Sequence, residues 1–230
     1  MKQFITILAA CCLVVCLSTA LVSCSEEDDA VVEFPDWQKT NDNYFNSLFA
    51  MVQQRISAGD TSWRLIRKWS LQDSIHLDPD DYVIAHVLEK GWGRQPLYSD
   101  TVLVHYQGRL LPSTSYPTGY VFDQTWLNSY DTATMRPAKM GVSQTVSYTY
   151  SSTSGGYVAS TSSNIDGFTT ALMDMNVGDR WEIYIPYNLG YGTEDYTTTK
   201  GTIPGYSTLV FDLTLADCYR AGESVPHGRH

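Results

Sequence analysis

Basic residues are scarce in this chain of 230 residues. Lysine and arginine together number 15, against 25 aspartates and glutamates, so the formal net charge is −10. A protein that binds nucleic acid needs a basic surface, because its affinity comes largely from the release of counterions from the phosphates. The charge balance therefore excludes nucleic acid as an expected partner.

Charged residues of either sign are also few, at 17% of the chain, and Ser, Thr, Gly and Tyr dominate its second half. This composition favours strands and loops over a helical bundle. The sequence shows no arrangement of side chains that would supply a nucleophile, a metal site or a redox group. We therefore expect neither a metal nor a cofactor. The length indicates one domain with a helical or extended appendage.

An apolar run over residues 4–22 follows a short charged start. Its length and flanks indicate an export signal and not a permanent membrane span. The end of the run, Leu21-Val22-Ser23-Cys24, resembles the lipobox of bacterial lipoproteins. The resemblance implies cleavage before Cys24, lipidation of its thiol, and a lipoprotein anchored to a membrane of the cell envelope, expected to be the outer membrane. The alternative is an ordinary secretory signal in which Cys24 is incidental.

Cysteines are almost absent after the signal. Residues 11, 12 and 16 would be removed with it, and Cys218 is the only cysteine beyond Cys24. If Cys24 is lipidated, Cys218 has no partner, and the mature protein contains no disulfide despite its export. Cys218 is then expected to be a small buried apolar residue.

The segment that follows the lipobox is acidic, with Ser25-Glu26-Glu27-Asp28-Asp29 at its start. It is either a solvated spacer or, because it resembles the acidic signal of Bacteroidota lipoproteins, an address for the cell surface. We assign residues 1–23 to the signal peptide, 24–35 to the acidic tether and 36–80 to an N-terminal helical extension.

A helix is predicted over residues 36–56, with Asp36 as its N-cap. Its apolar residues recur at three-to-four spacing: Trp37, Phe45, Leu48, Phe49, Val52 and Ile56. We expect this stripe to pack on its own domain, which favours a monomer, although packing on a partner chain is the alternative. The two alternatives predict different oligomeric states. Residues 63–69 show no pattern that assigns them to a helix or a strand.

Alternation with a period of two predicts strands over residues 81–91, 101–110, 180–186 and 208–215. Two alternating arms around Gly155-Gly156 predict a hairpin within residues 142–163. This hairpin is either an ornament at the edge of the sheet or an added wall for a particular client. A helix is predicted over residues 164–176, capped by Ser163 or Asn164.

Three motifs near the C-terminus carry a family resemblance: Pro186-Tyr187-Asn188-Leu189-Gly190-Tyr191-Gly192, Ile203-Pro204, and Ser207-Thr208-Leu209-Val210-Phe211-Asp212. They resemble the signature of FKBP-type peptidyl-prolyl isomerases, and the resemblance continues in order from residue 81 to residue 218 with one insertion. It implies an α+β fold in which a twisted antiparallel β-sheet wraps around a short α-helix. The isomerase domain would occupy residues 81–220, and residues 221–230 would form a tail.

The resemblance also implies a site and an activity, the cis–trans isomerisation of prolyl bonds in polypeptide clients. The residues that it places in catalytic positions are Asp123, Tyr191, Phe122 and Phe211. Those that it places in contact with substrate are Tyr106, Ile165, Phe168 and Ile203. Tyr191 would donate its hydroxyl to a substrate carbonyl, and the backbone N–H of Ile165 would donate to another. Asp123 would lie at the edge, where its carboxylate would either orient the tyrosine of the pocket or meet the twisted amide.

Several positions depart from the family pattern. Phe168 stands where the family usually has Trp, and Ala138 where it often has Phe. Asn164 and Thr202 replace apolar residues, and residues 193–200 are an insertion that would remodel the edge of the site. The activity is therefore expected to be weak or redirected.

Three functions follow from these observations. The first is an isomerase that assists the folding of exported or envelope proteins. The second is a catalytically weak or inactive binding module, or chaperone, on the same fold. The third is a carbohydrate-binding lipoprotein, suggested only by the many tyrosines and the possible surface address.

Overall fold

The computed structural model describes residues 31–72, 78–127, 129–132, 134–198 and 200–225. The chain separates into two units, residues 1–32 and 33–230, and every helix and strand described below belongs to the second unit. The predicted signal peptide and Cys24 lie outside the described residues. Within the described residues, no helix combines the length and the apolar character needed to cross a membrane.

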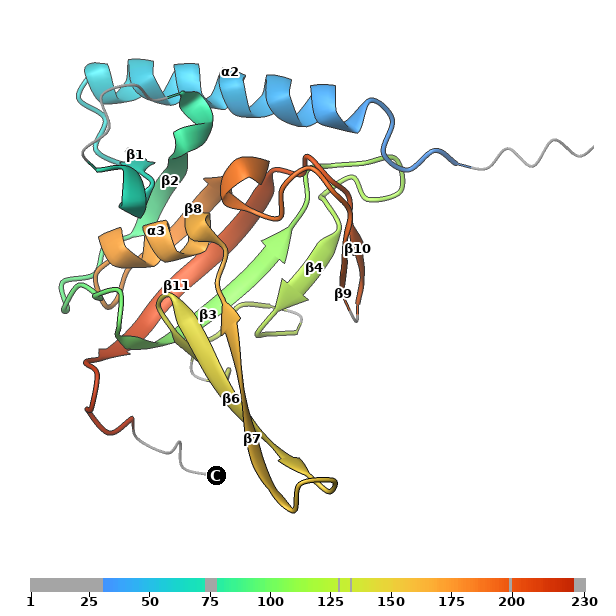
Figure 1. Ribbon diagram of the computed structural model, residues 1–230. Coiled ribbons are helices and arrows are strands. Elements are labelled where there is room, and N and C mark those ends of the chain that lie inside the picture. The colour runs from blue at the N-terminus through green and yellow to red at the C-terminus, as the bar shows by residue number, and fades with distance from the viewer. Residues whose placement is uncertain (1–30, 73–77, 128, 133, 199, 226–230) are drawn as a thin grey trace, which may run out of the picture. The chain divides into compact units, whose positions relative to one another are not determined.

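The centre of the second unit is an antiparallel sheet in the order β1-β2-β8-β11-β3-β4, with β5 also paired to β3 (Figure 1). Its strands are β1 (Trp63–Arg67), β2 (Tyr82–Glu89), β3 (Thr101–Arg109), β4 (Val121–Gln124), β5 (Ala138–Gly141), β8 (Arg180–Ile185) and β11 (Leu209–Tyr219). The longest strand, β11, lies between β8 and β3 in the middle of the sheet. The strands predicted from alternation are confirmed.

One face of this sheet is apolar because its strands alternate. Trp181, Ile183 and Ile185 of β8 are buried. So are the residues that alternate along β11: Leu209, Phe211, Leu213 and Leu215. The short helix α3 (Asp166–Asp174) covers this face. A Cβ atom on Gly167 would lie 2.3 Å from Cγ2 of Ile185, so only glycine allows α3 to approach β8 this closely.

The long helix α2 (Trp37–Ser57) packs on the opposite face of the sheet. Tyr184, which alternates with the buried isoleucines of β8, has its ring centroid 6.3 Å from that of Tyr44. The ring of Phe49 lies 5.5 Å from that of Tyr82 on β2. The α2 residues Trp37, Phe45, Phe49 and Val52 are part of the same buried cluster as the sheet. The prediction that the stripe packs on its own domain is confirmed for these residues and for Leu48, whereas Ile56 is 39% exposed.

The segment between α2 and β2 contains a strand and two short helical turns. Residues 63–67, which had no assignable structure in the sequence, form β1 and pair in register with β2. Two short 3-10 helices follow, Trp69–Leu71 and Pro79–Asp81. The predicted N-terminal extension therefore supplies one strand of the central sheet.

The predicted N-cap of α2 is confirmed in position, whereas the predicted N-cap of α3 is wrong. Asp36 occupies the N-cap position of α2, but its φ of 47° is left-handed and its side chain makes no capping hydrogen bond. The N-cap of α3 is Ile165, not Ser163 or Asn164. The Asn164 side chain instead donates to the carbonyl oxygens of Gly141 and Val142, at 2.8 and 3.0 Å. Asn164 thus fixes the base of the neighbouring hairpin.

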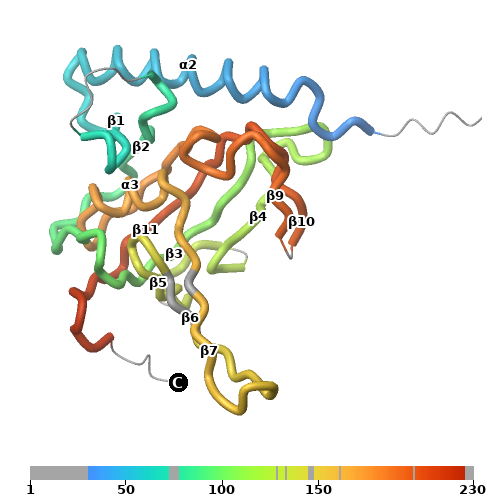
Figure 2. Tube along the Cα trace, in the orientation of Figure 1, coloured from blue at the N-terminus to red at the C-terminus, as the bar shows by residue number. Residues whose placement is uncertain are grey.

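Two hairpins stand apart from the central sheet. The first joins β6 (Gln144–Ser151) to β7 (Gly156–Ser163). Of the predicted Gly155-Gly156 pair, Gly155 lies in its turn and Gly156 begins β7, paired with Ser151. The second joins β9 (Tyr196–Thr198) to β10 (Gly201–Ile203); β9 lies within the predicted insertion of residues 193–200, and β10 follows it. The tube in Figure 2 shows the first hairpin projecting away from α3 and the sheet.

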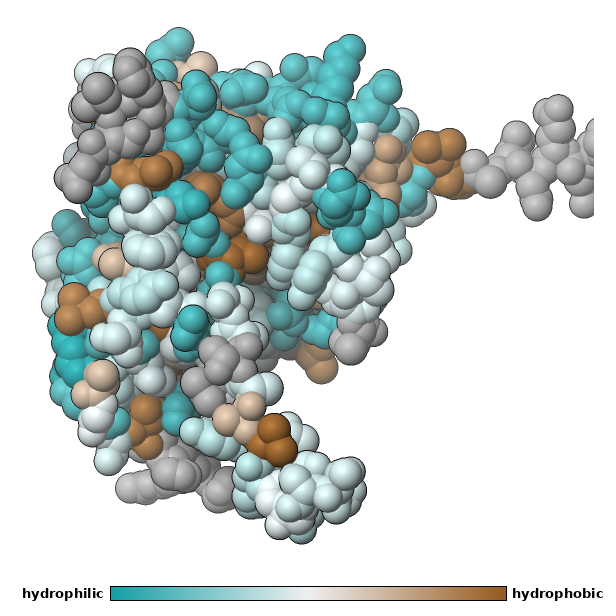
Figure 3. All heavy atoms as spheres, in the orientation of Figure 1, coloured by the Kyte–Doolittle hydropathy of each residue, from teal (hydrophilic) through white to brown (hydrophobic). Residues whose placement is uncertain are grey.

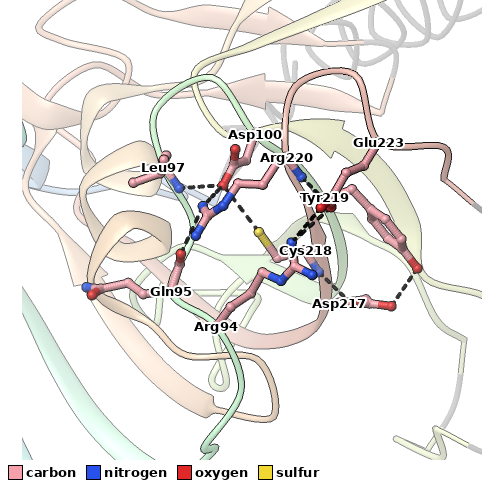
Figure 4. Close-up of polar contacts among 9 residues, drawn as sticks. All are labelled: Arg94, Gln95, Leu97, Asp100, Asp217, Cys218, Tyr219, Arg220 and Glu223. Carbon is pink, nitrogen blue, oxygen red and sulfur yellow. Dashed lines mark hydrogen bonds and ion pairs between the residues drawn. The ribbon is translucent and has the colours of Figure 1, made fainter.

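The end of β11 is tied to the turn before β3 through Asp100, which is 1% exposed (Figure 4). Its Oδ2 accepts hydrogen bonds from the Leu97 N–H at 2.7 Å and from the Cys218 thiol at 3.5 Å, and it pairs with Arg220. Burial, together with the bond to Asp100, raises the pKa of the Cys218 thiol to about 11. Cys218 is therefore buried, as predicted, and its thiol is protonated at neutral pH.

Candidate active site

A cavity of about 190 Å³ opens between the apolar face of the sheet, α3 and the two hairpins. Its lining residues come from β3, β4, β5, β11, the end of β7, the start of α3 and the β9 region. They are Tyr106, Phe122, Asp123, Met140, Ser163, Asn164, Ile165, Phe168, Tyr191, Tyr196 and Phe211. The side chains of this set are mostly apolar, with a few polar groups at the edge, which is the usual composition of a ligand site.

The floor of the cavity, by which we mean Phe122, Phe168 and Phe211, is a cluster of edge-to-face aromatic rings. Phe211 lies at its centre, with ring centroids 5.5 Å from Phe122 and 5.2 Å from Phe168. The ring of Tyr106 completes the wall at 6.2 Å from Phe211 and 5.9 Å from Phe168. Such contacts add stability beyond simple burial and fix the orientation of each ring.

Gly108 on β3 makes room for this floor. It pairs with Phe211 of β11 across the sheet. A Cβ atom at Gly108 would lie 2.6 Å from Cε1 of Phe211 and 2.7 Å from Cζ of Phe122. Both distances are shorter than van der Waals contact, so the two rings can meet above β3 only because this residue has no side chain.

Asp123 lies at the edge of the floor, and three donors surround its carboxylate. The Tyr106 hydroxyl donates to Oδ2 at 2.6 Å, and Oδ1 accepts from Lys200 Nζ at 2.7 Å and from the Gln124 N–H at 2.9 Å. Burial acts to raise the pKa of Asp123, but the hydrogen bonds from Lys200 and Tyr106 outweigh it and hold that pKa below its usual value. Asp123 is therefore an anion that orients Tyr106.

Tyr191 offers a free hydroxyl above the floor. Its ring stacks on Tyr196 of β9, with centroids 4.2 Å apart and an angle of 13° between the planes. Among the described residues, no group accepts a hydrogen bond from its hydroxyl. Burial raises the pKa of Tyr191 to about 12, so the hydroxyl keeps its proton at neutral pH. It is available to donate to a ligand.

The β9–β10 hairpin holds the rim of the cavity in place. The rim consists of Asp123, Tyr191, Tyr196 and Lys200. The Tyr120 hydroxyl donates to the carbonyl oxygen of Lys200 at 2.6 Å, next to the ion pair of Lys200 with Asp123. The side chains of that pair are 50% and 45% exposed. The insertion predicted to remodel the edge of the site therefore supplies both an aromatic ring and a cation.

Of the predicted site residues, the structure brings together all but one. Asp123, Tyr191, Phe122, Phe211, Tyr106, Ile165 and Phe168 line the cavity. Ile203 instead lies in the hydrophobic core, 1% exposed, and is not part of the lining. Ala138, placed by the resemblance at a pocket position, packs against the core, while Met140 from the same strand reaches the cavity.

Sequence reasoning missed Met140 and Tyr196 as wall residues and Lys200 as the partner of Asp123. The ion pair joins residues 77 positions apart, so no local pattern predicts it. Among the described residues, no group of three or more His, Cys, Asp or Glu side chains is gathered in a way that could hold a metal ion.

The chain is similar in sequence to known proteins of one family. The sequence model described as FKBP-type peptidyl-prolyl cis-trans isomerase matches residues 93–216. The chain is 31% identical over 157 residues, 68% of its length, to the macrophage infectivity potentiator of Trypanosoma cruzi, of which the match covers 62%. It is 31% identical over 131 residues, 57% of its length, to the FKBP-type 22 kDa peptidyl-prolyl cis-trans isomerase of Escherichia coli, of which the match covers 47%.

A third relative, the outer membrane protein MIP of Legionella longbeachae, is 30% identical over 59% of this chain and 43% of its own length. The chain thus matches less than two thirds of the length of each of these relatives. The family match, in contrast, extends over more than half of the chain and includes β3, β4, α3, β8 and most of β11. The chain belongs to the FKBP-type peptidyl-prolyl cis-trans isomerase family.

Proposed function

We propose that this protein is a peptidyl-prolyl cis-trans isomerase whose substrates are proline-containing polypeptides. The observation that carries the proposal is the Tyr191 hydroxyl, which lines a cavity with an aromatic floor and has no hydrogen-bond partner in the part of the chain that the structure describes. A prolyl bond rotates slowly because its C–N bond has partial double-bond character, with a barrier of ~20 kcal/mol. The planar amide is more polar than the twisted one, so transfer from water to an apolar floor favours the twisted form.

Each part of the cavity has a role in this proposal. Phe122, Phe168 and Phe211 receive the proline ring and exclude water. The Tyr191 hydroxyl and the backbone N–H of Ile165 donate hydrogen bonds to two substrate carbonyls. Asp123 holds the Tyr106 ring against the floor. These groups bind and orient the substrate, and no covalent step is needed.

The test is the cis-to-trans relaxation of a four-residue peptide that contains one Xaa-Pro bond, with and without the protein. We expect the relaxation rate to rise in proportion to protein concentration, and Phe122→Ala to abolish the increase. A wild-type protein that binds the peptide without accelerating relaxation would contradict the proposal.

The ion pair at the rim favours a second candidate, a binding module with little or no isomerase activity. Three donors already surround the Asp123 carboxylate, and one of them is Lys200. If Asp123 must meet the substrate directly, this pairing opposes catalysis. The relaxation test separates the two candidates, because the binding module retains affinity for the peptide and leaves its relaxation rate unchanged.

We infer further that the protein is an envelope lipoprotein of a Bacteroidota-like bacterium that assists the folding of exported proteins. Residues 1–23 would be the signal peptide, Cys24 the lipidated residue that anchors the chain to the membrane, and residues 24–35 the tether. The relative named as an outer membrane protein supports the envelope location. Residues 36–80 and 81–220 would then be the extension and the isomerase domain, with residues 221–230 as the tail.

Fractionation tests the anchor. The wild-type protein should sediment with membranes and incorporate labelled fatty acid, and Cys24→Ala should do neither. Equal labelling of both proteins would remove Cys24 as the lipidation site.

A further inference from the structure

The β6–β7 hairpin is a two-stranded sheet of its own, with eight register pairs from Gln144–Ser163 to Ser151–Gly156. Within the described residues neither strand has a second partner, so each has an open edge. Asn164 and Thr169 hold its base by hydrogen bonds to the carbonyl oxygen of Val142, at 3.0 Å each. The hairpin is thus fixed at one end to α3 and projects at the other (Figure 1).

One face of the hairpin carries exposed tyrosines. Tyr150 and Tyr157 form a cross-strand pair whose ring centroids are 5.6 Å apart, and Tyr148 lies two residues from Tyr150 on the same face. These three side chains are 59%, 75% and 69% exposed. Clustered exposed apolar groups of this kind indicate an interaction surface. In Figure 3 the projecting hairpin is pale to brown, in contrast to the teal of the α2 side of the molecule.

The edges of the hairpin lack the features that normally block strand addition. Proteins protect exposed edges with charged side chains, prolines or bulges. Residues 144–163 contain no Asp, Glu, Lys, Arg, His or Pro, although the chain as a whole carries a net charge of −10. The register of the hairpin also continues without a bulge. An extended polypeptide of either charge can therefore pair with it.

The hairpin leads directly into the cavity. Ser163, the last residue of β7, lines the cavity together with Asn164 and Ile165. Since side chains two residues apart share a face of a strand, Ser163 lies on the same face of β7 as Tyr157. A chain that leaves the cavity past Ser163 would run along the tyrosine face.

We propose that the β6–β7 hairpin is a docking surface for the extended polypeptide that continues from a prolyl residue bound in the cavity. The tyrosine rings pack against the side chains of this polypeptide, and an open edge of the hairpin pairs with the polypeptide backbone. The strand β7 has eight residues, so at ~3.3 Å per residue it accommodates about eight residues of substrate beyond the proline. The inference rests on the proposed isomerase function and extends its substrate from a dipeptide to a long unfolded segment.

The test compares three synthetic peptides: a four-residue Xaa-Pro peptide, and the same peptide extended by eight uncharged residues on its N-terminal or its C-terminal side. Dissociation constants are measured by fluorescence anisotropy. We expect one of the long peptides to bind the wild-type protein at least tenfold more tightly than the short one. The triple variant Tyr148→Ser/Tyr150→Ser/Tyr157→Ser should bind long and short peptides equally, within twofold.

The control is a triple variant that replaces exposed apolar residues outside the hairpin, Leu88→Ser/Trp92→Ser/Leu97→Ser, which are 43%, 83% and 54% exposed in the wild type. It should keep the gain from peptide length. Both triple variants should isomerise the short peptide at the wild-type rate, because the cavity is untouched.

Three outcomes would overturn the proposal: no gain from length in the wild type, a gain that survives in the tyrosine variant, or a dimer in sedimentation that the tyrosine variant loses. The last outcome would assign the surface to a second copy of this chain. A length gain that depends on the tyrosines, in a protein that isomerises none of the peptides, would support the docking surface and contradict only the isomerase function.

Discussion

Phe122, Phe168 and Phe211 in the floor of the cavity are 3%, 6% and 4% exposed, whereas Tyr196 at the rim is 46% exposed. The floor belongs to the sheet and α3, and its rings are also part of the main hydrophobic core. The rim takes Tyr196 and Lys200 from the insertion of residues 193–200 and is held by a half-exposed ion pair. The floor is therefore fixed by the same contacts that fold the protein, while the rim can change without unfolding it.

The largest difference in stability between floor and rim is expected from Phe211→Ala. Its ring contacts Phe122, Phe168 and Tyr106, so truncation leaves a cavity in the core. We expect a loss of ~3–5 kcal/mol in the free energy of unfolding, measured by urea denaturation. The same truncation at the rim, Tyr196→Ala, should cost less than ~1 kcal/mol. Equal losses of unfolding free energy at the two positions would mean that the floor and the rim contribute equally to stability.

The floor can also be disturbed by adding atoms. In Gly108→Ala the new methyl group would lie within 3 Å of both Phe122 and Phe211, so the rings must shift. We expect a loss of ~1–3 kcal/mol in stability together with weaker peptide binding. Gly155→Ala in the hairpin turn is a suitable contrast, because nothing lies within 4 Å of the added atom there. It should affect stability through its positive φ alone and leave peptide binding unchanged.

A change at the rim should affect activity more than folding. Lys200→Met removes the ion pair with Asp123, and because both side chains are about half exposed we expect less than ~1 kcal/mol of lost stability. The pKa of Asp123, measured by NMR titration, should rise, since Lys200 contributes to holding it down. If Lys200 competes with substrate for the carboxylate, kcat/KM rises by less than about tenfold. A decrease would show that the cation helps to bind the peptide.

The smallest effect is expected from pH. The pKa of Asp123 lies below its usual value, and that of Tyr191 is about 12, so neither group titrates between about pH 5 and pH 10. We therefore expect kcat/KM to be constant over this range. Because the pKa of Asp123 is lowered by folding, its contribution to stability is present above ~pH 4 and is lost as the pH falls through that lowered pKa. A bell-shaped rate profile near neutral pH would reveal a titrating group that the cavity as described lacks.

The floor could be predicted from the sequence because it follows a local rule. Period-two alternation in residues 180–186 and 208–215 places the core side chains on one face, and the order of the family motifs identifies Phe122, Phe168 and Phe211. The hairpin could be predicted for the same reason, from two alternating arms around Gly155-Gly156.

The rim could not be predicted in detail because its contacts are made between distant segments. The way in which the insertion folds back determines three features: the pairing of Lys200 with Asp123, the stacking of Tyr196 on Tyr191 and the position of Ile203 in the core. The predicted cap of α3 was wrong for a related reason. Asn164 has the side chain of a cap residue, but this side chain donates hydrogen bonds to the base of the β6–β7 hairpin and does not cap α3.

The most direct test of the account is Tyr191→Phe, which removes only the hydroxyl that has no partner among the described residues. We expect kcat/KM for a short Xaa-Pro peptide to fall by several-fold to ~100-fold, or ~1–3 kcal/mol, while the free energy of unfolding changes by less than ~0.5 kcal/mol. Tyr196→Phe, which keeps the stacked ring, should retain wild-type values of both. An unchanged kcat/KM in Tyr191→Phe, or a loss of rate matched by a loss of stability, would contradict the claim that this hydroxyl acts on the substrate.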